Sequence, residues 1–160
     1  MIQKISDKDL QIICELRKNA RMPLTKMSRK TMIPISTIHD KLKSFKDVLV
    51  KKYTSLLDFS ALGFNTRAHI MFKIKKERKD EIKEFLTKHQ NVNSIFKINN
   101  GFDFLIEGVF KSIKEMEEFT DLLESKYDIK GKETYFIIDE IKREEFFSET
   151  EKLSILGFQQ

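Results

Sequence analysis

Basic and hydroxyl side chains recur between residues 26 and 43 at a spacing that suits contact with double-stranded DNA. On one short predicted helix, Lys26, Arg29 and Lys30 can neutralise phosphates beside a groove, and each neutralised phosphate releases condensed counterions. The exposed side chains of the next predicted helix can reach base edges in the major groove. The candidates there are Thr37, His39 and Lys43, and Ser36 and Lys41 complete the set.

The residues after this segment add a second basic feature. An apolar run, Val48–Val50, precedes Lys51 and Lys52, which predicts a strand carrying a basic wing. Asp40 opposes binding to a polyanion unless it accepts a hydrogen bond from cytosine N4 or orients Lys43. Each lysine taken singly fits a solvated face better than a contact, but their combination favours nucleic-acid binding.

Charge is divided unevenly along the chain. Up to Leu57 there are 13 Lys and Arg against 5 Asp and Glu, whereas the remainder has 17 against 20. Such a division indicates two modules with different partners, one of them a polyanion. The length of 160 residues suffices for two small domains, each with its own core.

Three short helices are predicted at the start of the chain. Apolar side chains at helical spacing indicate a first helix from about Asp7 to Lys18, which Asn19 leaves in the left-handed conformation. Pro23 marks the entry to a second helix, and Ser36 is the best cap for a third. A turn of three or four residues between the second and third is typical of the helix-turn-helix, whose last helix enters the major groove.

From Thr66 the hydrophobic period changes to two, which indicates strands. Between the strands lie two segments at helical spacing, so the order is βαββαβ, the ferredoxin-like arrangement. In the second strand we expect one face to hold Val92, Ser94, Phe96 and Ile98. Asn99, Asn100 and Gly101 then supply the turn chemistry of a hairpin.

One face of the predicted sheet has no helix to cover it. Alternation places apolar side chains there, and this is more apolar surface than a monomer leaves in water. These residues are Leu105, Val109, Tyr135, Ile137 and Ile141. We therefore expect a homodimer that packs two sheets face to face, which would also present two recognition helices to two half-sites.

Several residues and segments together carry a family likeness over about Lys4 to Arg143. They are Asp7, Leu10, Ile13, Leu16 and Arg21, the Met27 to Ser36 turn, Ile38, Lys41 and Leu42, the strand ending at Tyr53, and the Leu62-Gly63 pair. In order and spacing they resemble the Lrp/AsnC, or feast/famine, transcriptional regulators. The resemblance implies an α+β fold, with a winged helix-turn-helix for promoter DNA followed by a ferredoxin-like βαββαβ domain that dimerises and often builds tetramers or octamers.

The resemblance also implies a small effector, commonly an amino acid, bound near a hairpin of a Gly-x-x-Asp type. The nearest match is Asn100, Gly101 and Asp103, with the acid one residue early. Asp103 could accept the ammonium, and backbone N–H groups around Asn100 and Gly101 could hold the carboxylate. The alternative is a plain hairpin turn with a solvated Asp103.

Three departures from the family pattern bear on DNA recognition. Pro34 stands where a capping serine is usual, and Asp40 stands where a basic residue is common. Lys46-Asp47-Val48 replaces the glycine before the wing, although Asp tolerates the left-handed conformation. These departures leave open a ligand-sensing or scaffolding protein whose helix-turn-helix no longer reads DNA.

The sequence gives little support to an enzymatic function. The glycines fall at no phosphate-loop or dinucleotide spacing, and the histidines have no partners at metal-ligand spacing, so we expect no catalytic residues, no metal and no cofactor. One alternative is an enzyme like the sirohaem decarboxylases, which resemble paired Lrp/AsnC chains. Arg67 and His69 would then be the residues to watch.

The expected organisation follows from these assignments. We predict a DNA-binding domain over 1–53, a linker over 54–65, a dimerisation and effector domain over 66–146, and a tail over 147–160. The tail could be a strand, a short helix or a segment that docks on a partner. With no apolar run near the roughly 20 residues of a membrane span and no signal-peptide pattern, we expect a cytoplasmic protein. Cys14 is the only cysteine and is expected to be a buried hydrophobe.

Overall fold

The computed structural model describes residues 5–153, which form two compact units. One unit contains the residues up to Ser55 together with those from Ile141 onward, and the other is Leu56–Glu140. Residues 141–146, which the sequence suggested would belong to the sheet domain, therefore group with the N-terminal helices. The same unit also takes in the described part of the predicted tail.

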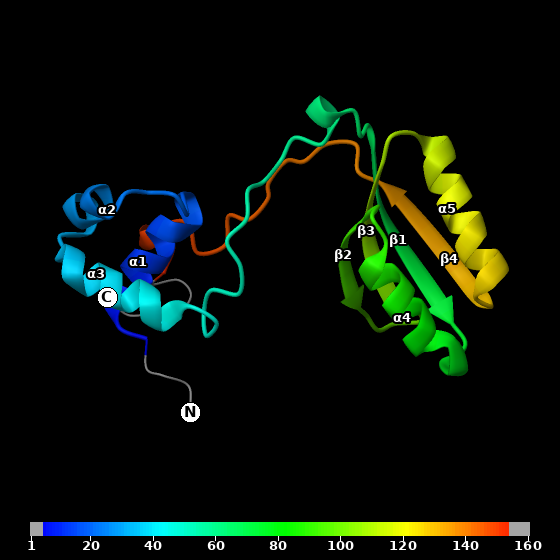
Figure 1. Cartoon of the computed structure of the whole chain (residues 1–160), viewed down its shortest axis with the longest axis horizontal. Helices are drawn as coiled ribbons and strands as arrows, with labels where there is room; N and C mark the ends of the chain where they lie inside the picture. Colours follow the sequence, from blue (N-terminus) through cyan, green and yellow to red (C-terminus); the bar gives the residue numbers. More distant parts are fainter. Residues whose placement is uncertain (1–4, 154–160) are drawn as a thin grey trace. The chain divides into compact units, whose positions relative to one another are not determined.

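The helical unit contains the three predicted helices, α1 (Asp7–Lys18), α2 (Leu24–Thr31) and α3 (Ile35–Phe45) (Figure 1). A capping box starts α1, because Ser6 accepts from the Asp9 N–H and the Asp9 side chain accepts from the Ser6 N–H. The helices enclose a small core. It consists of Ile12, Met22, Met27, Ile33, Ile38 and Phe45.

Two local predictions in this unit are wrong. Asn19 is extended after α1, with φ −158°, and the left-handed conformation occurs instead at Met32, with φ 56°, at the end of α2. Pro34, not Ser36, occupies the N-cap of α3, and Ser36 lies inside the first turn. Proline suits this place because its missing N–H and fixed φ cost little at a helix start.

The predicted wing strand is absent from the described chain. After α3, the Phe45 carbonyl accepts the N–H groups of Val48, Leu49 and Val50, so the chain closes a tight turn. Asp47 adopts φ 64° within this turn, as its tolerance of the left-handed conformation predicted. The turn leaves only an isolated bridge between Lys46 and Val50. A strand needs a neighbour for its backbone groups, and residues 51–57 form no regular structure.

The described part of the tail folds onto α1. Leu153 forms a small buried cluster with Leu10 and Cys14, and residues 150–152 make one 3-10 turn. Arg17 on α1 pairs with Glu144 at 2.8 Å and donates to the Phe146 carbonyl. Within residues 147–153 the chain thus forms one 3-10 turn and no strand. Ile155, Leu156 and Phe158 lie outside the described residues.

The second unit is a four-stranded antiparallel sheet with two helices (Figure 1). Its order along the chain is the predicted βαββαβ, and the strands lie side by side in the order β2-β3-β1-β4. The elements are β1 (Thr66–Ile74), α4 (Lys79–Lys88), β2 (Val92–Lys97), β3 (Phe104–Phe110), α5 (Ile113–Lys126) and β4 (Ile129–Phe136).

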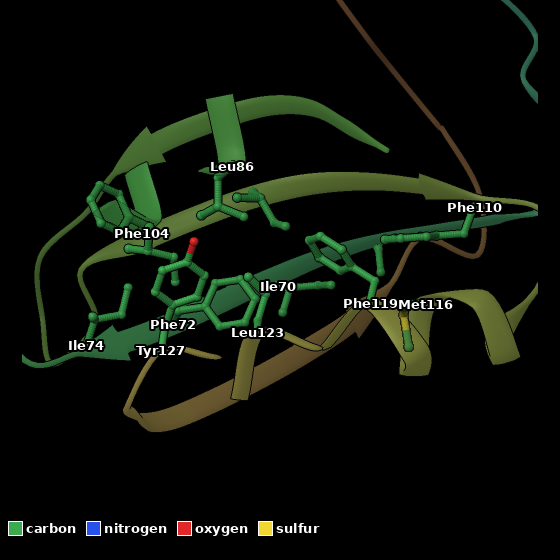
Figure 2. Packing of buried hydrophobic residues seen from close by; sticks show 13 residues of the cluster. Ile70, Phe72, Ile74, Leu86, Phe104, Phe110, Met116, Phe119, Leu123 and Tyr127 are labelled. Atoms are coloured by element: carbon green, nitrogen blue, oxygen red, sulfur yellow. The ribbon is translucent and has the colours of Figure 1, made fainter. Parts of the chain in front are cut away.

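Both helices cover one face of this sheet. Alternate β1 residues Ala68, Ile70, Phe72 and Ile74 are all buried there. Figure 2 shows Leu86 of α4 and the α5 side chains meeting this row.

Cys14, in the helical unit, is buried as predicted, and its burial raises the pKa of the thiol.

The edge strands depart from simple alternation. In β2, a register shift between Val92 and Ser94 turns Ile95 toward the core and leaves Phe96 on the opposite face, so the predicted single face was wrong. A bulge adds one residue and reverses the side-chain alternation beyond it. β4 ends at Phe136, but the Ile137 N–H still donates to the Arg67 carbonyl of β1, so Ile137 continues the pairing by one residue. Ile141 belongs to the helical unit, so its predicted place on the sheet face was wrong.

Candidate nucleic-acid interface and effector hairpin

The outer surfaces of α2 and α3 carry exposed cations and polar groups. Lys26 and Arg29 are exposed on α2, while Ser36, His39 and Lys43 are exposed on α3. Thr37 is half-buried. Because positions 36, 39 and 43 follow at intervals of three and four, these α3 side chains share one face of the helix.

Two of the predicted contact residues already have acidic partners on α1. Lys30 lies 2.9 Å from Glu15, and Lys41 lies 2.9 Å from Asp9. Both carboxylates are largely buried, whereas the lysines remain partly exposed. The pairs therefore join α2 and α3 to α1, and a phosphate would have to compete with a carboxylate for either lysine.

The pKa of both acids is lowered. Burial by itself disfavours the charged form, but hydrogen bonds from Ser6 and Lys41 to Asp9 outweigh it. For Glu15, burial is likewise outweighed by hydrogen bonds from Lys30 and Lys18. The sequence pattern on each helix could not reveal these pairs, because they join residues on different helices.

Four further basic residues of this unit, Arg21, Lys46, Lys51 and Lys52, are exposed. Lys51 and Lys52 lie on the irregular segment after the turn. Arg21 and Lys46 were not among the predicted DNA contacts. Only their positions in the sequence could have indicated a contact with DNA, since Arg21 precedes α2 and Lys46 follows α3. Asp40 is 82% exposed and lies 3.5 Å from His39 Nδ1, a different neighbour from the Lys43 considered above.

The predicted effector residues meet in the hairpin between β2 and β3. Asn100 and Gly101 have φ values of 63° and 95°, and the Ile98 N–H donates to the Asp103 carbonyl. Two successive residues at positive φ match the turn that suits a tight hairpin, and glycine adopts this conformation without strain. The structure thus brings together Asn100, Gly101 and Asp103.

The Asp103 carboxylate has partners of its own. Oδ2 accepts the Ile74 N–H at 2.9 Å, and Oδ1 lies 2.5 Å from Lys79 Nζ. Burial opposes ionisation, but the hydrogen bonds from Lys79 and Ile74 prevail and lower the pKa of Asp103. Asp103 therefore ties the hairpin to the end of β1 and the start of α4. A ligand ammonium would have to share this carboxylate with Lys79.

The sheet face opposite the helices has a polar centre. Glu107 is only 6% exposed, and it pairs with Arg67 at 2.7 Å while Asn93 donates to its other oxygen. Arg67 also reaches Glu140 at 2.8 Å. His69 pairs in register with Glu107 and Tyr135, so it lies on the same face. Arg67 is accordingly held by carboxylates.

Apolar side chains surround this polar centre. Phe96 and Tyr135 are 53% and 55% exposed, and Leu105, which pairs with Phe96 in register, is half-buried. Val109 is buried. Of the apolar residues predicted for this face, the sheet thus contributes Leu105, Val109 and Tyr135, and it adds Phe96.

Within residues 5–153, no group of three or more His, Cys, Asp and Glu side chains is arranged to hold a metal ion. Among the same residues, no helix has the length and apolar character needed to cross a membrane.

Comparison with protein families gives a match to the Lrp/AsnC ligand binding domain over residues 67–145. A curated relative, the HTH-type transcriptional regulator FL11 of Pyrococcus furiosus, is 27% identical over 135 residues, which cover 84% of this chain and 89% of the relative. The aligned region includes both units, because it is longer than the sheet unit alone.

Solved structures share the fold. The chain matches LrpC of B. subtilis with a TM-score of 0.79 and 20% identity, over 88% of this chain and 99% of that one. It matches the transcriptional regulator NMB0573 of Neisseria meningitidis, solved as a complex with L-Met, with a TM-score of 0.79 and 21% identity. That match covers 89% of this chain and 94% of the other.

Proposed function

Because this chain belongs to the Lrp/AsnC family of transcriptional regulators, we propose that α2 and α3 bind promoter DNA, and that the sheet unit dimerises and senses an amino acid. The relatives are regulators rather than enzymes, so the sirohaem-decarboxylase alternative is dropped. We keep the predicted DNA-binding segment 1–53, with the tail supporting its helices. Residues 56–65, predicted as part of the linker 54–65, group with the sheet unit, which ends at Glu140.

The exposed cations on α2 and α3 are the observation that supports the proposed DNA binding. Lys26, Arg29 and Lys43 are exposed on the two helices that form the helix-turn-helix. Phosphate contacts position a protein on the duplex, while side chains on the second helix reach the base edges. We assign Lys26 and Arg29 to phosphates, and His39 and Lys43 to bases. Lys30 and Lys41 contribute less, because they pair with Glu15 and Asp9.

Fluorescence anisotropy with a duplex obtained by in vitro selection tests these roles. Arg29→Ala should weaken binding to the selected and a random duplex alike, whereas Lys43→Ala should reduce the preference between them. Lys114→Ala is the matched control, since Lys114 is 85% exposed on α5 of the sheet unit. Equal losses from the Arg29 and Lys114 changes would contradict the proposal.

Dimerisation through the open sheet face is supported by its exposed apolar side chains. Phe96 and Tyr135 leave about half of their surfaces in water, and a second sheet packed on them would remove that surface. A closed twofold contact would satisfy both copies at once. Because a closed twofold contact would occupy this face, tetramers or octamers would require additional surfaces.

Analytical ultracentrifugation can test this face with two comparable changes. Phe96→Asp should convert the dimer to a monomer, because it buries a charge in the contact. Leu122→Asp should leave the dimer intact, because Leu122 is similarly exposed, at 46%, but lies on α5. A dimer that survives the Phe96 change, or a monomeric unmodified chain, would contradict this arrangement.

The β2–β3 hairpin is proposed as the effector site. The similar structure from N. meningitidis is a complex with L-Met, which makes L-methionine the first ligand to try. Asn100 and Gly101 would offer backbone N–H groups to the carboxylate, and Asp103 would accept the ammonium. Lys79 already meets this carboxylate, so it should compete with the ligand.

Isothermal titration calorimetry with L-methionine tests the site. Asp103→Ala should abolish binding, while Lys79→Ala should tighten it by removing the competing cation. Asp121→Ala on α5 is a control, because Asp121 is exposed on a helix away from the hairpin. Unchanged affinity in both the Asp103 and Lys79 variants would exclude this hairpin as the site.

A further inference from the structure

The turn between α2 and α3 presents apolar atoms where a DNA-binding surface is otherwise charged and polar. Met32 is 86% exposed and Ile35, the first residue of α3, is 44% exposed. Pro34 between them is also exposed. Single exposed apolar residues are common on proteins, but three within four positions at the start of a recognition helix form a small apolar surface.

Met32 is held in an unfavourable backbone conformation. Its φ of 56° is the left-handed region, which glycine adopts freely and a long side chain does not. The chain thus keeps a large apolar side chain in water at a position where glycine would be less strained. Backbone strain of this kind persists where the surrounding structure or a function requires it.

Ile35 lies on the side of α3 that carries the proposed base contacts. Positions 35, 39 and 43 are spaced by four residues, so Ile35, His39 and Lys43 form one row along the helix. All three are exposed. The row therefore begins with an aliphatic group and ends with a cation, and Arg29 adds a further exposed cation on α2.

The partner that fits such a row is a polyanion with apolar groups along its recognised edge. The major groove of DNA offers this combination, because each thymine displays a C5 methyl group beside its hydrogen-bonding O4. The first residues of a recognition helix are the ones that reach base edges. A protein partner would match the apolar patch, but it would have to place acids against the neighbouring cations.

From these observations we infer that Ile35 reads a thymine methyl group, and that the operator carries thymine at the base pair facing the start of α3. The inference rests on the proposed DNA binding by α2 and α3. It adds a specificity determinant of a chemical type different from the polar residues considered so far. Met32 and Pro34 exclude water around this contact.

Replacing thymine by deoxyuridine removes only the methyl group and keeps the hydrogen-bonding edge. With a duplex obtained by in vitro selection, each thymine is replaced in turn and binding is measured by fluorescence anisotropy. At one position per half-site the unmodified protein should bind about four-fold more weakly, the value for about 0.8 kcal/mol per buried methyl-sized group. Ile35→Ala should bind the thymine and uracil duplexes equally at that position.

Leu49→Ala is the matched control variant. Leu49 is 43% exposed, nearly the same as Ile35, but it lies in the turn after α3. This variant should keep the full thymine preference. The inference is overturned if no thymine position responds, or if Ile35→Ala keeps the same response as the unmodified protein. A change in sedimentation of Ile35→Ala would instead assign Ile35 to a protein contact.

The same measurements separate this inference from the proposed function. Specific duplex binding without any methyl effect contradicts only the role of Ile35. If selection yields no preferred duplex and binding to random DNA is absent, DNA binding by α2 and α3 is wrong, and the role of Ile35 with it.

Discussion

The helical unit and the sheet unit are stabilised in different ways. Thirteen buried residues form one cluster beneath the sheet, whereas the three helices enclose a cluster of six. The helical unit adds other supports, namely the pairs that Asp9 and Glu15 make with lysines and the contact of Leu153 with α1. A small unit that devotes its outer face to cations must obtain stability from such contacts, because a small core buries less apolar surface.

The largest effect is expected in the core of the sheet unit. Phe72 is fully buried in the middle of β1, so Phe72→Ala should lower the free energy of unfolding of this unit by about 3–5 kcal/mol. Hydrogen exchange measured by mass spectrometry can follow each unit separately. Peptides of β1 and β3 should lose protection, while those of α1 to α3 should change little. Equal loss in both units would show that they unfold together.

A smaller effect is expected from the tail. Leu153→Ala removes a side chain that is 3% exposed against Leu10 and Cys14, and it should destabilise the helical unit by about 2 kcal/mol. Faster hydrogen exchange in α1 with unchanged exchange in β1 would show this. Unchanged α1 protection would mean that the tail adds nothing to the helical unit.

The pairs on α1 should make the helical unit sensitive to acid. The pKa of Glu15 is lower than its usual value in the folded chain, so its stabilising contribution is present above the unfolded pKa near 4.5 and is lost as pH falls through the lower folded pKa. Glu15→Gln should cost roughly 1 kcal/mol at pH 7 and flatten this acid dependence. Denaturant unfolding followed at pH 7 and pH 4 checks both parts, and Glu118→Gln on α5 is the control.

The smallest effect should be a stabilisation. Met32→Gly removes a side chain from a left-handed position and should raise the stability of the helical unit by about 0.5–1 kcal/mol. Thermal unfolding monitored by circular dichroism would show the change as a higher midpoint. A lower midpoint would mean that the Met32 side chain makes a stabilising contact despite its exposure.

Helices and strands with strong local signals were predictable from the sequence. The bounds of α1 match the predicted Asp7–Lys18, because the cap at Ser6 and the apolar spacing agree there. β1 alternates without interruption from Thr66, in agreement with the hydrophobic period of two. The hairpin after β2 was predictable because Asn100 and Gly101 both adopt positive φ readily, as they do in the structure.

The remaining features depend on contacts between distant residues. The register shift at Val92 comes from pairing with β3, and a strand after α3 would have required a neighbour that residues 48–53 do not find in the described chain. The pairing of Lys30 and Lys41 with acids of α1 likewise depends on tertiary packing. These pairs divide the predicted contact residues into free and engaged cations, a distinction that helix periodicity does not contain.

The central claim is that the exposed cations of α2 and α3 hold DNA phosphates. The most direct measurement is the salt dependence of binding to the selected duplex. The logarithm of the binding constant should fall steeply and linearly with the logarithm of salt concentration, and Arg29→Ala should reduce the slope by about 0.9 per subunit. Lys114→Ala should leave the slope unchanged. A flat salt response, or equal slopes for the unmodified protein and Arg29→Ala, would contradict the claim.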